Sequence, residues 1–279
     1  MGNFKKDLEQ LKRYRENNDR KSREVVQLWE NSISVNIENL GKEKHIVLEQ
    51  VCIAAADTFR LNIAQRCIQE LYRDFPNSSR VRVLESMVYE ADENYPKALQ
   101  ILNDIIKHDN TNSAAKKRKI AIFKALGRYP EAIKELTEYL KTFMADVEAW
   151  QELSELYLNE HDYSKAAFCV EELILHNPHN HLLHQRYADI KYTHGGIENL
   201  EIAKTYYYQT LKLNPKNIRA LFGIYLTTTA LLNSQKNMPQ KKKDSAQKAA
   251  EWSIKQIKKR YAEENNVDHI QKSLAALEI

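Results

Sequence analysis

The residues with the most evident capacity for chemistry lie in one stretch, NEHDYSKAAFCVEELILHNPHNHL, which spans residues 159–182. It holds four histidines, one cysteine and four carboxylates. Imidazole, thiolate and carboxylate groups are common zinc ligands, and a cysteine beside a histidine can act as a nucleophile. The stretch therefore raises two hypotheses, a metal site and a catalytic site, and the elements that position these side chains must decide between them and ordinary packing.

Sequence motifs for catalysis are missing from the rest of the chain. Glycine stands only at positions 2, 41, 127, 195, 196 and 223, which excludes both GxGxxG and a Walker-type phosphate loop. There is also no GxSxG elbow, no HExxH motif and no cysteine with an assigned histidine partner. The sequence therefore predicts a protein that is not an enzyme and that binds neither a cofactor nor a catalytic metal.

The three cysteines, Cys52, Cys67 and Cys169, are odd in number, widely spaced and without a CxxC pair. This pattern indicates neither a disulfide framework nor a structural zinc site. A reducing compartment fits it best.

Composition favours an all-helical, soluble protein. Of 279 residues 43% are hydrophobic, and there are only six glycines and six prolines, whereas residues with high helix propensity abound. The N-terminus, MGNFKKDLEQ, lacks the apolar core of a signal peptide. The longest uncharged apolar run, residues 220–232, falls short of the roughly 20 residues that a membrane-spanning helix needs.

Positive charge concentrates near the C-terminus, although the net charge of the whole chain is only +4. Residues 236–260 contain nine Lys or Arg against Asp244 and Glu251. Such a segment could lie near phospholipid headgroups, or it could be a solvated face of a terminal helix. Nucleic acid is not expected as a partner, because only Trp252 and Tyr261 could stack on bases.

Alanines recur along the chain at a nearly constant interval. Ala64, Ala98, Ala132, Ala166 and Ala203 are separated by 34, 34, 34 and 37 residues. This is the period of the tetratricopeptide repeat, a pair of antiparallel helices. Tyrosines recur three residues before three of these alanines, and prolines close three of the units. A small residue at the alanine position lets the paired helices approach closely, and a proline ends the second helix.

The predicted fold is therefore all-α, a right-handed tetratricopeptide-repeat superhelix, or α-solenoid, with helical caps at both ends. The predicted segments are capping helices at 1–44, repeats at 45–232, an exposed loop at 233–243, and a C-terminal capping helix and tail at 244–279. Asn77, Ser113, Asp146 and Asn180 are expected to cap first helices. The fifth repeat carries three extra residues, for which the Gly195–Gly196 pair supplies backbone freedom.

The repeat pattern predicts that residues 159–182 serve helix packing and turns rather than chemistry. His161 falls in the turn between paired helices, and Cys169 falls on the inward face of a second helix at the repeat position that Cys67 also occupies. The histidines at 176, 179 and 181 surround Pro178, which ends the unit. His181 and His184 could still share a helical face and hold a divalent metal opportunistically.

A solenoid offers a concave groove lined by first helices, at repeat positions 2, 5, 9 and 12. We expect its mixture of apolar and charged residues to suit an extended peptide or a helix of a partner protein. The groove positions are Val83, Met87, Glu90, Lys117, Ala121, Lys124, Gln151, Glu155, Leu158, Gln185, Asp189, Tyr192 and Phe222.

A generic peptide-binding adaptor or a co-chaperone is the alternative within this fold. A clamp for acidic chaperone C-termini needs Lys, Asn and Arg at set positions of three successive repeats. The corresponding residues are Lys117, Ala121, Glu152, Leu182 and Arg186, so most of the clamp is missing.

Four segments carry a more specific resemblance: RKIAIFKALG, EAWQELSELYLNEHDYSKAAFCVEELILHNPHNHL, YADIKYTHGGIENLE and LKLNPKNIRALFG. They closely resemble the family of subunit 2 of the endoplasmic reticulum membrane protein complex, a tetratricopeptide family. The resemblance is dense from about residue 118 to residue 225 and looser elsewhere.

The resemblance implies a non-catalytic scaffold subunit, peripheral on the cytoplasmic face of the endoplasmic reticulum membrane. In this family the repeats gather cytosolic tails of membrane subunits, one of which lies in the groove, and bind a second soluble subunit. The complex inserts transmembrane helices, and the insertase chemistry belongs to other subunits.

Overall fold

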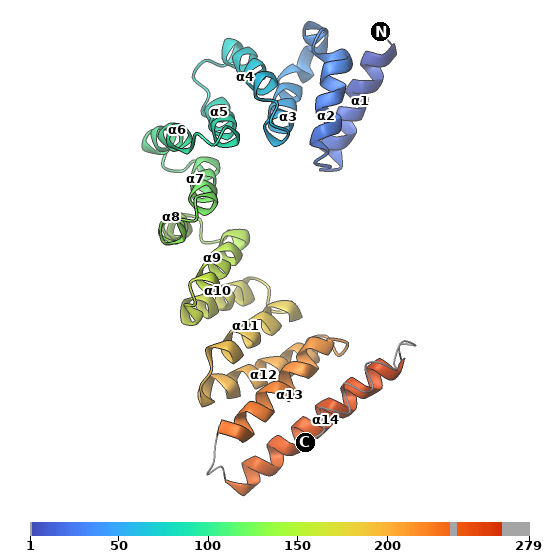
Figure 1. Ribbon diagram of the computed structural model, residues 1–279, viewed down its shortest axis with the longest axis vertical. Helices are drawn as coiled ribbons and strands as arrows, with labels where there is room; N and C mark the ends of the chain where they lie inside the picture. The colour runs from blue at the N-terminus through green and yellow to red at the C-terminus, as the bar shows by residue number, and fades with distance from the viewer. Residues whose placement is uncertain (1, 235–238, 264–279) are drawn as a thin grey trace. The chain divides into compact units, whose positions relative to one another are not determined.

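The computed structural model describes residues 2–234 and 239–263 (Figure 1). These ranges contain fourteen α-helices and no strand, which confirms the prediction of an all-α fold. Among the described helices, none is both long enough and apolar enough to cross a bilayer. The chain divides into two compact units, residues 1–135 and 136–279.

The first unit begins with two helices and two short irregular turns of helix, and continues as helical pairs. Its elements are α1 (Gly2–Glu16), α2 (Ser22–Leu28), a π-helix (Trp29–Ile33), a 3-10 helix (Ile37–Glu43), α3 (Lys44–Asp57), α4 (Leu61–Asp74), α5 (Ser79–Ala91), α6 (Tyr95–His108) and α7 (Ser113–Ala125). Helix α8 (Tyr129–Thr142) contains the division between the units.

The second unit continues with α9 (Val147–Asn159), α10 (Tyr163–His176), α11 (His181–His194), α12 (Ile197–Leu213), α13 (Ile218–Ser234) and α14 (Gln240–Glu263). Consecutive helices pack on one another in chain order, and α14 lies along α13 (Figure 1). Each unit is therefore built from contacts between neighbours in the sequence, as expected of repeat proteins.

The five periodic alanines are the points of close helix approach. All five have no exposed surface. Small side chains lie opposite two of them: Cys52 Sγ is 3.8 Å from the carbonyl oxygen of Ala64, and Ser154 Oγ donates a 3.2 Å hydrogen bond to the carbonyl oxygen of Ala166. Cys52 and Ser154 each stand twelve residues before their alanine, so the same contact recurs in different hairpins.

The turns inside the helical pairs share one backbone conformation. Phe59, Glu93, Gly127 and His161 all have positive φ, between 56° and 69°, and they lie 34 residues apart. Left-handed backbone costs a residue with a side chain about 1–2 kcal/mol, yet only one of the four is glycine. The packing of the flanking helices therefore fixes the turn, whatever residue occupies it.

The turn between α11 and α12 is different, and here glycine is required. Gly195 has φ 77° and ψ −178°, and Gly196 has φ 84° and ψ 151°. These angles lie in a region that essentially only glycine adopts. The glycine pair thus accommodates the three extra residues of this repeat.

Helix starts agree with the predicted caps in two cases and differ by one residue in two others. Asp146 and Asn180 cap α9 and α11 with their side chains, as predicted. At α5 and α7, however, the caps are Ser78 and Asn112, whose side chains accept hydrogen bonds from the N–H groups of Val81 and Ala115. Each misassigned site offers two adjacent capping residues, and the helix packing selects one of them.

The C-terminal helices are longer than the sequence suggested. Helix α13 extends to Ser234, and α14 begins at Gln240, directly after Pro239, rather than near Asp244. Of the predicted loop and tail, residues 235–238 and 264–279 lie outside the described residues.

Candidate partner-binding groove

In the first unit, the predicted groove residues lie on α5 and α7. Val83 packs partly into the cluster formed by Ala98, Leu102 and Ala115, and Met87 packs partly onto the cluster that contains Leu84 and Val88. Both side chains are half-buried and keep some exposed surface. Lys117 and Lys124 on α7 are also half-buried.

Glu90 on α5 forms an ion pair that links two first helices. Arg118 Nε on α7 lies 2.7 Å from Glu90 Oε2. Burial raises the pKa of Glu90 above its usual value, although the neighbouring Arg118 acts in the opposite direction. The predicted groove residue Glu90 thus contributes to the packing of the first unit as well as to its surface.

In the second unit, the predicted residues Gln151, Gln185 and Asp189 line one cavity of about 580 Å³. They come from two first helices, α9 and α11, and Leu158 and Leu182 add apolar surface to the same wall. This is the combination of apolar surface and a few polar groups that binding sites commonly have.

Two arginines that the groove prediction did not include also line this cavity. Arg219 on α13 is 74% exposed at its side chain and places Nη2 3.3 Å from Asp189 Oδ2. Asp189 also accepts a 2.6 Å hydrogen bond from the hydroxyl of Tyr207. Burial, and then this bond, raise the pKa of Tyr207.

Arg186 on α11 is the second of these arginines. Its Nη2 lies 3.5 Å from Glu155 Oε1, whereas its Nε is buried and has no hydrogen-bond partner among the described residues. A buried donor without a partner is costly, and because this nitrogen is shielded it is not itself a contact point for a bound chain.

Tyr192 and Phe222 complete the predicted set. Each is half-buried against a hydrophobic cluster of the second unit: Tyr192 against Ala188 and Ala203, Phe222 against Leu221 and Ile257. Neither lines the cavity described above.

A smaller cavity of about 360 Å³ lies near α8, α9 and α10 and is largely apolar. Met144 and Phe168 at this site are 68% and 51% exposed. The indole of Trp150 donates a 2.8 Å hydrogen bond to the carbonyl oxygen of Met144. Exposed apolar surface of this kind commonly marks protein contacts.

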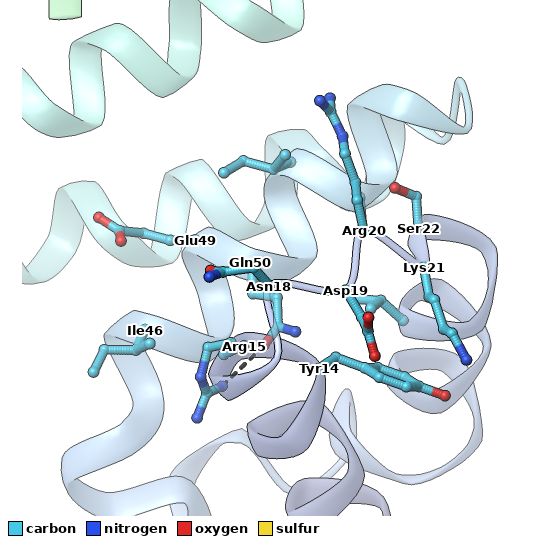
Figure 2. Close-up of a pocket in the computed structure, with 13 residues that line it drawn as sticks. Tyr14, Arg15, Asn18, Asp19, Arg20, Lys21, Ser22, Ile46, Glu49 and Gln50 are labelled. Atoms are coloured by element: carbon cyan, nitrogen blue, oxygen red, sulfur yellow. Dashed lines mark hydrogen bonds between the residues drawn. The ribbon is translucent and has the colours of Figure 1, made fainter. Parts of the chain in front are cut away.

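A cavity of about 350 Å³ in the first unit involves the turn between α1 and α2 and helix α3 (Figure 2). Figure 2 shows Arg15 reaching toward Gln50, and Arg15 Nη1 donates a 2.9 Å hydrogen bond to Gln50 Oε1. Arg20 forms a bidentate pair with Asp57, at 2.9 and 2.6 Å. Because both arginines are engaged with α3, we interpret this site as the attachment of the N-terminal helices.

The histidine-rich stretch is used for turns and packing. His161 occupies the left-handed turn before α10, and His184 is buried with Nε2 2.8 Å from the carbonyl oxygen of Pro178. His181 Nε2 is 3.0 Å from Asn214 Nδ2. Across residues 2–234 and 239–263, no three or more His, Cys, Asp or Glu side chains gather in an arrangement that could hold a metal ion.

The cysteine thiols are buried, and burial raises their pKa values, to about 12 for Cys52 and Cys169. Burial raises the pKa of Cys67 in the same way. A thiol with such a pKa is almost entirely protonated near pH 8, and the protonated form is a poor nucleophile.

We therefore expect iodoacetamide to leave all three cysteines of the native chain unmodified at pH 8, and to alkylate all three after denaturation, as counted by intact mass. Rapid alkylation of native Cys169 would contradict this result and would restore the nucleophile hypothesis.

Helical pairs whose turns repeat every 34 residues, with a buried alanine at each crossing, define a tetratricopeptide-repeat protein. The fold resembles a solved structure, the C-terminal part of a tetratricopeptide-repeat protein from Cytophaga hutchinsonii. The TM-score is 0.63 with 13% identity, over 99% of this chain and 100% of that one.

Sequence relatives define the family. A family model described as "EMC2 TPR-like repeat domain" matches residues 69–198. ER membrane protein complex subunit 2 of Xenopus tropicalis is 51% identical over 91% of this chain and 85% of its own length. The TPR repeat protein oca3 of Schizosaccharomyces pombe is 30% identical over 74% of each chain. The chain belongs to the ER membrane protein complex subunit 2 family.

Proposed function

We propose that this chain is a non-catalytic scaffold subunit of an ER membrane protein complex that inserts transmembrane helices. In this proposal it is peripheral on the cytoplasmic face of the endoplasmic reticulum membrane. The names of its relatives support the assembly, since they are described as subunits of such a complex.

The observation that supports the scaffold role is the larger cavity of the second unit, lined by Gln151, Gln185 and Asp189, which we call the groove. It combines about 580 Å³ of space and apolar walls with the exposed guanidinium of Arg219. These features suit an extended segment of another protein, whose apolar side chains would fill the cavity while its oxygen atoms accept hydrogen bonds from Arg219. The proposed occupant is the cytosolic tail of a membrane subunit.

The apolar surface around Met144 and Phe168 supports a second contact, for which we propose a soluble subunit. Because this cavity and the groove have no lining residue in common, one chain could bind two partners at once. A scaffold requires this capacity, whereas a simple peptide adaptor does not.

Affinity isolation of the tagged chain from membranes extracted with mild detergent tests the proposal. A scaffold subunit should be recovered with stoichiometric membrane proteins. Recovery of the chain alone, or with substoichiometric chaperones, would instead favour the adaptor or co-chaperone alternative.

Charge reversal at Lys117 and Lys124 tests the groove surface of the first unit. We expect the double variant K117E/K124E to recover at least about fivefold less of the membrane subunits, because two attractive contacts become repulsive. Its thermal unfolding should stay near that of the parent chain, since both lysines keep exposed surface.

The matched control reverses two exposed lysines on second helices, Lys107 on α6 and Lys134 on α8. This variant carries the same change in net charge and should recover the partners normally. Loss of partners in the control, with normal recovery in K117E/K124E, would place the binding surface on the second helices.

A further inference from the structure

The terminal helix α14 has a buried face and an opposite face that carries lysines. Ala246, Ala250, Ser253 and Ile257 are buried where α14 packs along α13. At 3.6 residues per turn, positions 248, 252, 255 and 259 lie on the side away from these residues. Lys248, Trp252, Lys255 and Lys259 are all exposed, and we call them the α14 stripe.

The lysines of the α14 stripe are available for an external partner. Within the part of the chain that the structure describes, no carboxylate pairs with Lys248, Lys255 or Lys259. The flanking cations differ, because Lys242 Nζ lies 3.6 Å from Glu201 Oε1 and Arg260 donates a 2.9 Å hydrogen bond to the carbonyl oxygen of Pro215. The helix holds eight basic and three acidic residues. Asp244 and Glu251 stand one turn before Lys248 and Lys255 and offset part of their charge, but the helix keeps a clear excess of positive charge.

An exposed aromatic pair accompanies these cations. Trp252 is 42% exposed, and its ring centroid lies 6.2 Å from that of Tyr208 on α12, which is 37% exposed. Tryptophan and tyrosine combine a large apolar body with a polar tip, and both are favoured where an apolar phase meets water.

We propose that the α14 stripe binds the surface of a bilayer that contains anionic phospholipids. Its first and last lysines stand eleven positions apart on one straight face, about 16 Å, which matches a planar array of headgroups better than a single ligand. Lysine is a point charge suited to this diffuse attraction, whereas bidentate recognition of phosphate or carboxylate uses arginine. A nucleic acid would call for successive aromatic platforms, and the stripe has one tryptophan.

Membrane binding goes beyond the scaffold role and does not depend on it. The stripe lies on α14, and none of its residues lines the groove. The chain could therefore hold its protein partners and contact lipid headgroups at the same time.

Vesicle flotation with the purified full-length chain tests the proposal. We expect the chain to float with vesicles of phosphatidylcholine and phosphatidylserine, and to float much less with phosphatidylcholine alone or at high salt. A lysine near an anionic membrane contributes roughly a fivefold factor, so K248E/K255E/K259E should bind at least about tenfold more weakly. A matched variant, K5E/K107E/K134E, carries the same charge change at exposed positions of the first unit and should bind as the parent does.

Fluorescence of Trp252 gives a second measurement, since Trp29 is buried and Trp150 lies elsewhere. Anionic vesicles should shift the emission of the parent chain to the blue, and Trp252→Phe should abolish the shift. Equal flotation of the two triple-lysine variants would overturn the proposal. It would also fail if K248E/K255E/K259E lost co-isolated subunits while keeping its vesicle binding, because the stripe would then contact protein. If the parent chain bound vesicles normally but no subunits were isolated with it, the scaffold function would be contradicted and the membrane-binding proposal would stand.

Discussion

Replacement of Gly223 by alanine is expected to lower the free energy of unfolding by about 1–3 kcal/mol, the usual cost of overpacking. A Cβ atom at this position would overlap the ring of Tyr207, which is 3% exposed and held by its hydrogen bond to Asp189. The ring cannot move aside without losing that bond. Chemical denaturation of the parent and the G223A variant measures the effect.

A chain that already carries Tyr207→Ala provides the control. In that chain, G223A should raise the free energy of unfolding instead of lowering it. Without the ring there is no overlap, and alanine is intrinsically more favourable than glycine in a helix by about 1 kcal/mol. We expect G223A to stabilise the Tyr207→Ala chain. Equal destabilisation in both backgrounds would mean that the ring is not the cause.

Replacement of Ala166 by leucine should have a comparable or larger effect, on the order of 1–3 kcal/mol or more. Ala166 has no exposed surface, and its carbonyl oxygen accepts a hydrogen bond from Ser154 on the facing helix. A leucine would force α9 and α10 apart. Because Tyr187 of the neighbouring hairpin packs in the same cluster as Ala166, that hairpin would be disturbed as well.

The midpoint of thermal unfolding tests this expectation, with Ala125→Leu as the control. Ala125 ends α7 and is exposed, so the same added side chain should change stability by no more than about 0.5 kcal/mol. If Ala166→Leu unfolded at the temperature of the parent chain, the buried crossing would not be a close contact.

The fold was largely predictable because residues that recur at a fixed interval make the same helix–helix contact in each repeat. The spacing of the alanines from Ala64 to Ala203 fixed where paired helices must cross, and all five alanines are buried. The exact N-cap residues could not be predicted in this way. At α5 and α7 the caps are Ser78 and Asn112, each one residue from the predicted position, because two adjacent residues can cap equally well and packing selects one. The π-helix Trp29–Ile33 precedes the repeats and had no periodic signal.

Only part of the lining of the larger cavity in the second unit was predictable. Repeat positions identified Gln185 and Asp189 as lining residues, whereas Arg186 and Arg219 were not among the predicted positions. Nor could the sequence show that the Arg186 Nε donor is buried without a partner in the described residues, or that Gly223 faces the Tyr207 ring. Both depend on side chains brought together from separate helices, which no spacing rule encodes.

The left-handed turns at positions 59, 93, 127 and 161 present a phenyl ring, a carboxylate, a bare glycine and an imidazole from the same backbone geometry. The flanking helices impose that geometry, so glycine is not required at these positions. At such sites the exposed side chain can change, and with it the chemistry of the surface, while the turn and the helices beneath it stay the same.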